Sequence, residues 1–224
     1  MAMGDIAFNL LIFFVILGAL LVGFLANAAL FSSHHELSIS RIDGAILLFF
    51  FLLFLLYVYK MARETVLADT VRAPLGRARS ATYIALGVAG LYFGGRWTVD
   101  GAVELARMAG VDDALIGLTV LAIGTSLPEL IASAVAAWRN HADMAVGNVV
   151  GSNIFNLLWI LGFTGCFVEL PFEVVNNDDI MMVIFSSSLL ILALVTSRGN
   201  TVRRAHGFVF VLFYAAYIGY VVQR

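Results

Sequence analysis

Seven apolar segments of membrane-spanning length dominate this 224-residue chain and limit it to a narrow set of folds. A helix needs roughly 20 mainly apolar residues to cross the hydrocarbon core of a bilayer. The segments that meet this requirement are residues 5–31, 42–59, 82–108, 113–138, 143–167, 179–197 and 205–222. Because every backbone polar group must be hydrogen-bonded inside the bilayer, we expect these segments to be helices. The sequence therefore predicts an all-α integral membrane protein.

The composition excludes an ordinary soluble domain. Hydrophobic residues make up 62% of the chain and charged residues 12%, whereas soluble domains carry about 25% charged residues. The one cysteine, Cys166, excludes an internal disulfide and a cysteine-based metal cluster. The first apolar segment is too long for a signal-peptide core and lacks a cleavage site, so we expect a retained span. Nothing favours nucleic-acid binding, and the predicted partner is the lipid bilayer.

Lysine and arginine gather in alternate connections between the segments. These residues are Lys60, Arg63, Arg72, Arg77, Arg79, Arg139, Arg198, Arg203 and Arg204. The opposite connections hold Glu169, Glu173, Asp178, Asp179 and the patch His34-His35-Glu36. Cytoplasmic loops carry the excess of lysine and arginine. The pattern predicts a cytoplasmic N-terminus and an external C-terminus. We expect the membrane to be the inner (cell) membrane of a bacterium or archaeon.

A weak internal repeat relates the first two segments to the last two. The matching features are Asp5-Ile6 and Asp179-Ile180, Arg41-x-x-Gly44 and Arg204-x-x-Gly207, and Tyr57 and Tyr220, each 13 residues after its glycine. In an alternating chain the two copies run in opposite directions, and inverted repeats are typical of secondary transporters. The alternative is that apolar helices with interfacial Tyr and Arg resemble one another through composition alone.

The motif GTSLPE at residues 124–129 places a carboxylate, two hydroxyls and a proline inside an apolar segment. An ionisable residue at bilayer depth indicates a functional site. Pro128 has no N–H and its ring presses on the Gly124 carbonyl, so the helix should break there. Hard cations prefer the carboxylate, hydroxyl and carbonyl oxygens that this motif offers. The alternative is a proline kink with Glu129 bound to a neighbouring helix.

A second motif, GNVVGSNIFN at residues 147–156, follows in the next segment. Asn148, Ser152 and Asn156 recur every four residues and form a polar stripe on an apolar helix. Glycines beside the stripe permit close helix approach. Taken alone, the stripe fits amide hydrogen bonds between helices as well as it fits ion binding.

With these two motifs, residues 116–162 resemble the alpha-repeat of the calcium/cation antiporter superfamily, sodium/calcium exchanger type. The resemblance implies an inverted-repeat helical bundle with broken helices at 124–128 and near 151–153. It assigns residues 1–60 to the last two membrane helices of a first half, 61–81 to a basic cytoplasmic loop, and 82–224 to a second half of five helices.

The resemblance also implies a set of metal ligands around Glu129 as the central carboxylate. The implied ligands are the Ala122 carbonyl, Thr125, Ser126, Glu129, Ser152 and Asn156. The transported ions would be Ca²⁺ and Na⁺, with no cofactor. Asn156 falls where family members have either Asp or Asn, which leaves the preferred ion and the stoichiometry open.

The predicted function is secondary cation antiport, Na⁺/Ca²⁺ exchange by alternating access, and not an enzymatic reaction. Ca²⁺/H⁺ or K⁺-dependent exchange stays open within the same family. The chain has three prolines and one GTSLPE motif, so by this resemblance it lacks the first alpha-repeat and holds half of a transport site. A non-transporting or half-site subunit is therefore the other alternative, completed by a missing first half or by a second copy.

Overall fold

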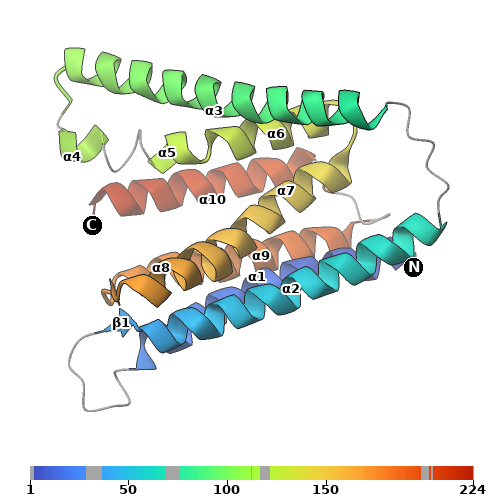
Figure 1. Cartoon of the computed structure of the whole chain (residues 1–224). Coiled ribbons are helices and arrows are strands. Elements are labelled where there is room, and N and C mark those ends of the chain that lie inside the picture. The colour runs from blue at the N-terminus through green and yellow to red at the C-terminus, as the bar shows by residue number, and fades with distance from the viewer. Residues whose placement is uncertain are drawn as a thin grey trace. The chain divides into compact units, whose positions relative to one another are not determined.

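The computed structural model describes residues 3–28, 37–68, 76–111, 113–116, 122–197, 202 and 204–223, and Figure 1 shows that they are almost entirely helical. The helices are α1 (Met3–Ala26), α2 (Arg41–Ala68), α3 (Arg77–Met108), α4 (Asp113–Ile116), α5 (Ala122–Thr125), α6 (Leu127–Trp138), α7 (Ala142–Ile154), the π-helix η3 (Phe155–Ile160), α8 (Leu161–Phe167), α9 (Asn176–Thr196) and α10 (Arg204–Gln223). Two short strands, β1 (Ser38–Ile39) and β2 (Leu170–Pro171), pair in antiparallel register with Ser38 opposite Pro171. The prediction of an all-α fold is confirmed.

Within the described ranges, four helices have the length and hydropathy of membrane spans: Arg41–Arg63, Ala142–Phe167, Asn176–Thr196 and Arg204–Val221. Leu10–Ala26 and Leu127–Trp138 are shorter apolar helices. Helix α3 is long enough to span a bilayer, but Arg96, Asp100, Glu104 and Arg107 make it more polar than the others. Arg96 lies 3.7 Å from Asp100, one turn away on the same helix.

Two helices extend into residues 61–81, which the sequence analysis assigned to a loop. Helix α2 continues to Ala68 and α3 begins at Arg77, so part of this connection is helical. A membrane-spanning helix can continue beyond the bilayer, because water solvates the charged side chains of the extension. Residues 29–31 and 117–121 of the predicted spans and the His34-His35-Glu36 patch lie outside the described residues.

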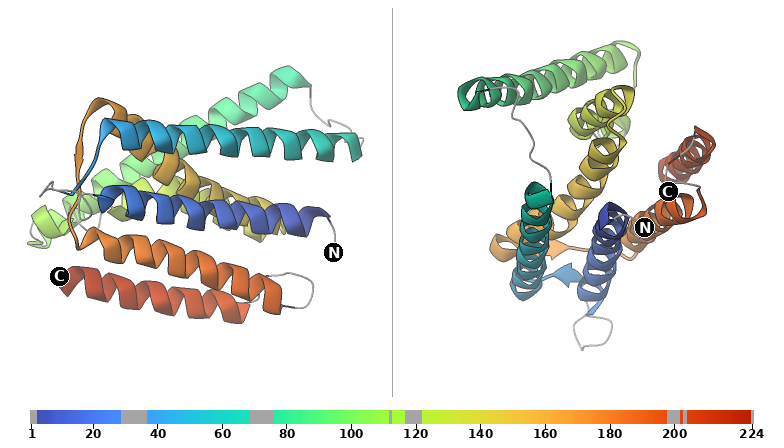
Figure 2. Two further views of the ribbon diagram at one scale, coloured as in Figure 1. Left: turned by 90° about the horizontal axis from the view of Figure 1, so that it is seen from below. Right: turned by 90° about the vertical axis from the view of Figure 1, so that its right-hand side faces the viewer.

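The chain divides into two compact units, unit 1 (Met1–Met61 and Asn153–Arg224) and unit 2 (Ala62–Ser152). In unit 1, α1 packs against α9 and runs in the opposite direction (Figure 2). Asn27 at the end of α1 and Asn177 at the start of α9 exchange amide hydrogen bonds of 2.7 and 3.1 Å. Helices α2 and α10 also run in opposite directions (Figure 2), as an inverted repeat requires.

The interior of unit 1 is built from aliphatic side chains of α1, α2 and the η3 region. Its largest fully buried side chains are Ile12, Val15, Leu47, Ile154 and Leu158. Helix α2 begins with a capping box, in which the Ser40 backbone N–H donates to the Asp43 carboxylate at 2.8 Å and the Asp43 N–H donates to the Ser40 hydroxyl at 3.3 Å. This cap fixes the start of α2 directly after strand β1.

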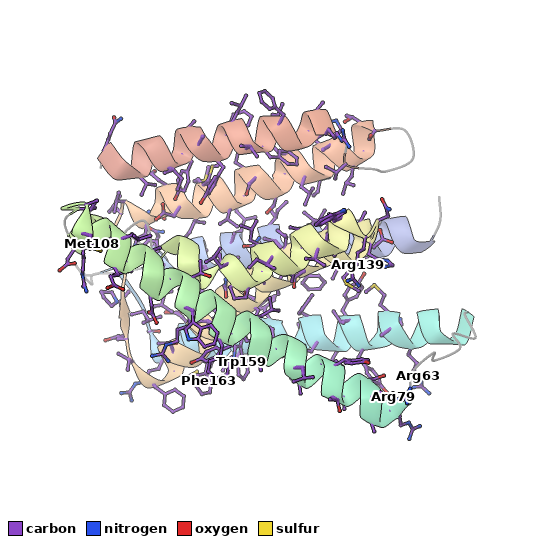
Figure 3. All side chains as sticks on the ribbon, turned by 90° about the horizontal axis from the view of Figure 1, so that it is seen from above. Arg63, Arg79, Met108, Arg139, Trp159 and Phe163 are labelled. Atoms are coloured by element: carbon purple, nitrogen blue, oxygen red, sulfur yellow. The ribbon has the colours of Figure 1, made fainter. Side chains whose placement is uncertain are left out.

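In unit 2, the short helix α5 and the start of α6 lie against α3. A Cβ built on Gly95 of α3 would lie 3.5 Å from Cγ of Pro128, which is ordinary van der Waals contact. Helices α6 and α7 form a hairpin whose turn places Asn140 at φ 61°, a left-handed conformation that asparagine adopts more readily than most residues. Arg63, Arg79 and Arg139 lie toward one end of unit 2, whereas Met108 lies at the other end (Figure 3).

Candidate cation site

The helix is interrupted at Ser126, where the sequence predicts a break. Helix α5 ends at Thr125, Ser126 forms a turn at φ −97° and ψ 0°, and α6 starts at Leu127. Pro128 occupies the first turn of α6, where a missing N–H costs no helical hydrogen bond. The proline therefore helps to start a new helix, and the break predicted at 124–128 is confirmed.

Glu129 lies in the first turn of α6, and its Oε2 atom is buried. Among the described residues no group donates a hydrogen bond to this oxygen. A buried carboxylate oxygen without a donor is unfavourable, since the charged group has lost water without a replacement. The positive end of the α6 dipole offsets part of that cost. This arrangement suits a carboxylate that receives a cation.

The hydroxyl ligands predicted from the sequence lie at the break itself. Thr125 ends α5 and Ser126 forms the turn, and both residues are exposed. Ala122 begins α5, so its carbonyl belongs to a helix of a single turn. Within the described part of the chain, no group of three or more His, Cys, Asp and Glu side chains could hold a metal ion. A cation beside Glu129 would therefore take its other oxygens from hydroxyls, backbone and water.

Ser152 and Asn156 come from the helix that follows the hairpin. The Ser152 hydroxyl donates to the Val149 carbonyl at 3.0 Å, which leaves the oxygen lone pairs of Ser152 available to a cation. Ser152 belongs to unit 2 with Glu129, whereas Asn156 belongs to unit 1. The role of Asn156 as a ligand therefore stays a prediction.

The irregularity predicted near 151–153 takes another form and lies later. Helix α7 runs through these residues to Ile154, because residues 147–156 contain glycine but no proline to remove a helical hydrogen bond. The helix then changes to the π-helix η3, in which the Leu161 N–H donates to the Asn156 carbonyl. Trp159 and Phe163 stack across the junction with α8, at a centroid distance of 5.4 Å (Figure 3). Short π-helical turns are frequent at functional sites.

Asn148 and Ser133 join α7 to α6 beside Glu129. Asn148 Nδ2 donates to the Glu129 carbonyl at 3.2 Å and to the Ser133 hydroxyl at 3.0 Å. Asn148 of the polar stripe therefore forms hydrogen bonds between helices, which was one of the two roles considered for the stripe. The sequence interpretation missed Ser133, although its position four residues after Glu129 puts both on one helix face.

The described helices have the length and composition of an α-helical integral membrane protein. Residues 79–223 match the family described as sodium/calcium exchanger protein. The chain belongs to this family, and the resemblance recognised from its motifs is confirmed.

Relatives with known names support the same assignment. The chain is 33% identical over 194 residues to the putative antiporter CaxA of Alkalimonas amylolytica, covering 82% of this chain and 60% of that protein. It is 34% identical over 143 residues to the sodium/calcium exchanger MaX1 of Methanosarcina acetivorans, covering 64% of this chain and 41% of that protein. The chain therefore spans 60% or less of the length of these relatives.

A solved structure has the same fold. The sodium-calcium exchanger NCX_Mj, in crystals soaked with Na⁺ and Ca²⁺, superposes with a TM-score of 0.71 at 31% sequence identity. The match covers 95% of this chain and 64% of that chain.

Proposed function

We propose that this chain acts in secondary cation antiport and exchanges Na⁺ for Ca²⁺ by alternating access. Glu129 is the carboxylate that binds the cation at mid-membrane. The observation that carries the proposal is the buried Glu129 Oε2 atom, which has no hydrogen-bond donor among the described residues and lies beside an interrupted helix. The names of MaX1 and NCX_Mj as sodium/calcium exchangers support the choice of ions.

The remaining ligands follow from the break. Thr125 and Ser126 supply hydroxyl oxygens, Ala122 supplies a carbonyl oxygen, and Ser152 supplies a hydroxyl from α7. Ca²⁺ accepts six to eight oxygen ligands in flexible geometry, including carboxylate, carbonyl and water. Na⁺ is hard as well, so the same oxygens can serve both ions in turn. No covalent step is required.

Flux through proteoliposomes tests this proposal. The full chain is reconstituted, and Ca²⁺-dependent efflux of radioactive sodium is compared between the wild type, Glu129→Gln and Glu104→Gln. Glu129→Gln removes the carboxylate charge and should abolish exchange. Glu104→Gln makes the same chemical change at an exposed position on α3 and should retain it. Wild-type exchange by Glu129→Gln would refute the role of Glu129.

A second candidate function differs in the ion that is coupled to Ca²⁺. Asn156 leaves this choice open, because it supplies an amide where a carboxylate would add charge. The human sodium/potassium/calcium exchanger 4 is 33% identical over 92 residues, covering 39% of this chain and 15% of that protein. This similarity favours K⁺-dependent exchange as the alternative, with Ca²⁺/H⁺ exchange beside it. The same flux assay distinguishes them when it is run with and without internal K⁺ and with and without a pH gradient.

A half-site subunit is the alternative from a different class. One carboxylate supplies one negative charge, whereas a divalent cation is better neutralised by two. We propose that the second carboxylate comes from a second copy or from a segment outside this chain. Cross-linking in the same proteoliposomes tests this, because exchange by a strict monomer of this chain would exclude the need for a partner.

The proposed orientation places the α6–α7 turn in the cytoplasm. The three arginines gathered toward one end of unit 2 (Figure 3) support it, because positive charge accumulates on the cytoplasmic side. The N-terminus is then cytoplasmic and the C-terminus external, in a cell membrane.

A further inference from the structure

We infer that Asn148 is a positioning residue for Glu129, and that its side-chain amide fixes the turn of α6 that carries the cation-binding carboxylate. The inference rests on the proposed function, since it assigns a role relative to the Glu129 site. It goes beyond that function because Asn148 acts on the backbone of Glu129 and on Ser133 and does not bind the cation.

The geometry identifies the donor end of the amide. Asn148 Nδ2 lies 3.2 Å from the Glu129 carbonyl oxygen and 3.0 Å from the Ser133 hydroxyl. A carbonyl can only accept a hydrogen bond, so the NH₂ group and not the amide oxygen must face α6. Both NH₂ hydrogens then donate to one helical turn, which begins at Glu129 and ends at Ser133. A cation cannot be bound by this NH₂ group.

The contact matters because α6 starts beside the break. The N-cap Ser126 makes no side-chain capping bond, and Glu129 lies only three residues further on. A helix start without a cap frays more readily, since its first N–H groups have no partners. In the described part of the chain, the two Asn148 bonds are the side-chain hydrogen bonds that link α6 to α7. They hold the first turns of α6 from the opposite helix and so limit where the carboxylate can lie.

Two small buried residues lie on α6 and α7 near the hairpin turn. Ala136 of α6 and Ala145 of α7 are both buried near the hairpin turn, at 5% and 9% exposure. The turn is closed by the His141 N–H, which donates to the Ala136 carbonyl at 2.9 Å. Asn148 lies three residues beyond Ala145, one turn further from the hairpin. The register of the hairpin therefore brings Asn148 opposite the first turns of α6.

Calcium binding to the purified full chain in lipid nanodiscs tests the inference by isothermal titration calorimetry. Asn148→Ala should weaken Ca²⁺ binding by about tenfold, on the scale expected when two interhelical hydrogen bonds are lost in a membrane protein. Ser133→Ala removes one of the two bonds and should weaken binding about two- to threefold. The double variant should bind no more weakly than Asn148→Ala, because the two residues act through one contact.

Asn148→Asp separates positioning from direct binding. A carboxylate cannot donate to the Glu129 carbonyl, so a positioning role predicts Ca²⁺ binding at least as weak as in Asn148→Ala. A ligand role predicts tighter binding, because the variant adds a negative charge. Gln223→Ala, which removes an exposed amide from α10, serves as the control and should bind like the wild type. Thermal unfolding of each variant shows whether the fold is retained.

The outcomes separate this inference from the proposed function. If Glu129→Gln loses Ca²⁺ binding while all Asn148 variants bind like the wild type, the positioning role is overturned and the cation site stands. Tighter binding by Asn148→Asp also overturns it. If Glu129→Gln binds like the wild type, the cation site itself fails, and the positioning role fails with it.

Discussion

Gly44 of α2 and Gly162 of α8 bring their helices into direct backbone contact. A Cβ built on Gly44 would lie 2.8 Å from the Gly162 carbonyl oxygen and 2.7 Å from the Cys166 nitrogen. Helix α2 can approach α8 this closely only because neither residue carries a side chain, as is common where membrane helices cross. The crossing follows directly after the π-helix η3, so the C-terminal part of that continuous helix is held firmly against α2.

Gly44→Ala should destabilise unit 1 by about 1–3 kcal/mol, the range for overpacking a tight contact. The new methyl group would meet backbone atoms, which cannot rotate away, so the helices must separate. The midpoint of unfolding in detergent measures the loss. Gly219→Ala is the matched control, since a Cβ there meets nothing within 4 Å among the described residues. Equal stability of the two variants would contradict the close crossing.

Gly124→Ala should disturb the proposed cation site from the α3 side. Its Cβ would clash with Cγ2 of Val99, and the β-branched valine has little rotamer freedom to move away. Helix α5 must then shift from α3 and carry Thr125 with it. We expect weaker Ca²⁺ binding in calorimetry and a lower unfolding midpoint.

Val99→Ala provides the compensating change for Gly124→Ala. Removing the two valine methyl groups makes room for the new alanine, so the double variant should recover part of the lost binding and stability. Val99→Ala alone should lower stability modestly, because it leaves a space against Gly124. A double variant that is no better than Gly124→Ala would show that α5 does not pack on Val99.

Tyr217→Phe should weaken the contact between α9 and α10. The Tyr217 hydroxyl donates to the Asp179 carboxylate, and the Tyr220 hydroxyl donates to the Asp178 carboxylate. Interhelical hydrogen bonds in membrane proteins contribute about 0.6 kcal/mol on average and up to about 1.7 kcal/mol. The first contact is part-buried and the second is exposed, so Tyr217→Phe should cost more stability than Tyr220→Phe.

Unfolding midpoints of the two variants measure this difference. Tyr214→Phe makes the same change at an exposed position on α10 and should leave the midpoint unchanged. A loss in Tyr214→Phe as large as that in Tyr217→Phe would argue against the contact with Asp179.

Much of the fold could be predicted from residue properties that act locally. Apolar length identifies helices such as α2 and α9, because the bilayer requires roughly 20 apolar residues for each span. Pro128 identifies the break before α6, because a missing N–H and a ring clash are properties of one residue. Glu129 could be identified as a candidate ligand for a similar reason, since a charge in an apolar segment needs a partner.

The features that could not be predicted depend on which helices meet. The crossing at Gly44 involves residues more than a hundred positions apart, and a glycine in a sequence does not say which backbone it faces. Asn148 could be placed on a polar stripe. Its hydrogen bond to the Glu129 carbonyl could not be predicted, because this bond depends on the register of the α6–α7 hairpin. The π-helix after Ile154 could not be predicted, because residues 155–160 contain no proline or glycine that would mark an irregular turn.

Orientation in the membrane gives the last prediction, and two exposed residues can report it. His141 lies in the α6–α7 turn next to Arg139, and Glu173 lies in the acidic connection before α9. The excess of arginine predicts that the turn faces the cytoplasm and the acidic connection faces outward. Cysteine is introduced at each position in a Cys166→Ser background, so that the native thiol does not react.

A membrane-impermeant maleimide applied to intact cells should label Glu173→Cys, whereas His141→Cys should be labelled only after the membrane is permeabilised. Labelling in the reverse order would invert the topology, and labelling of both in intact cells would mean that the connections do not alternate between the two faces.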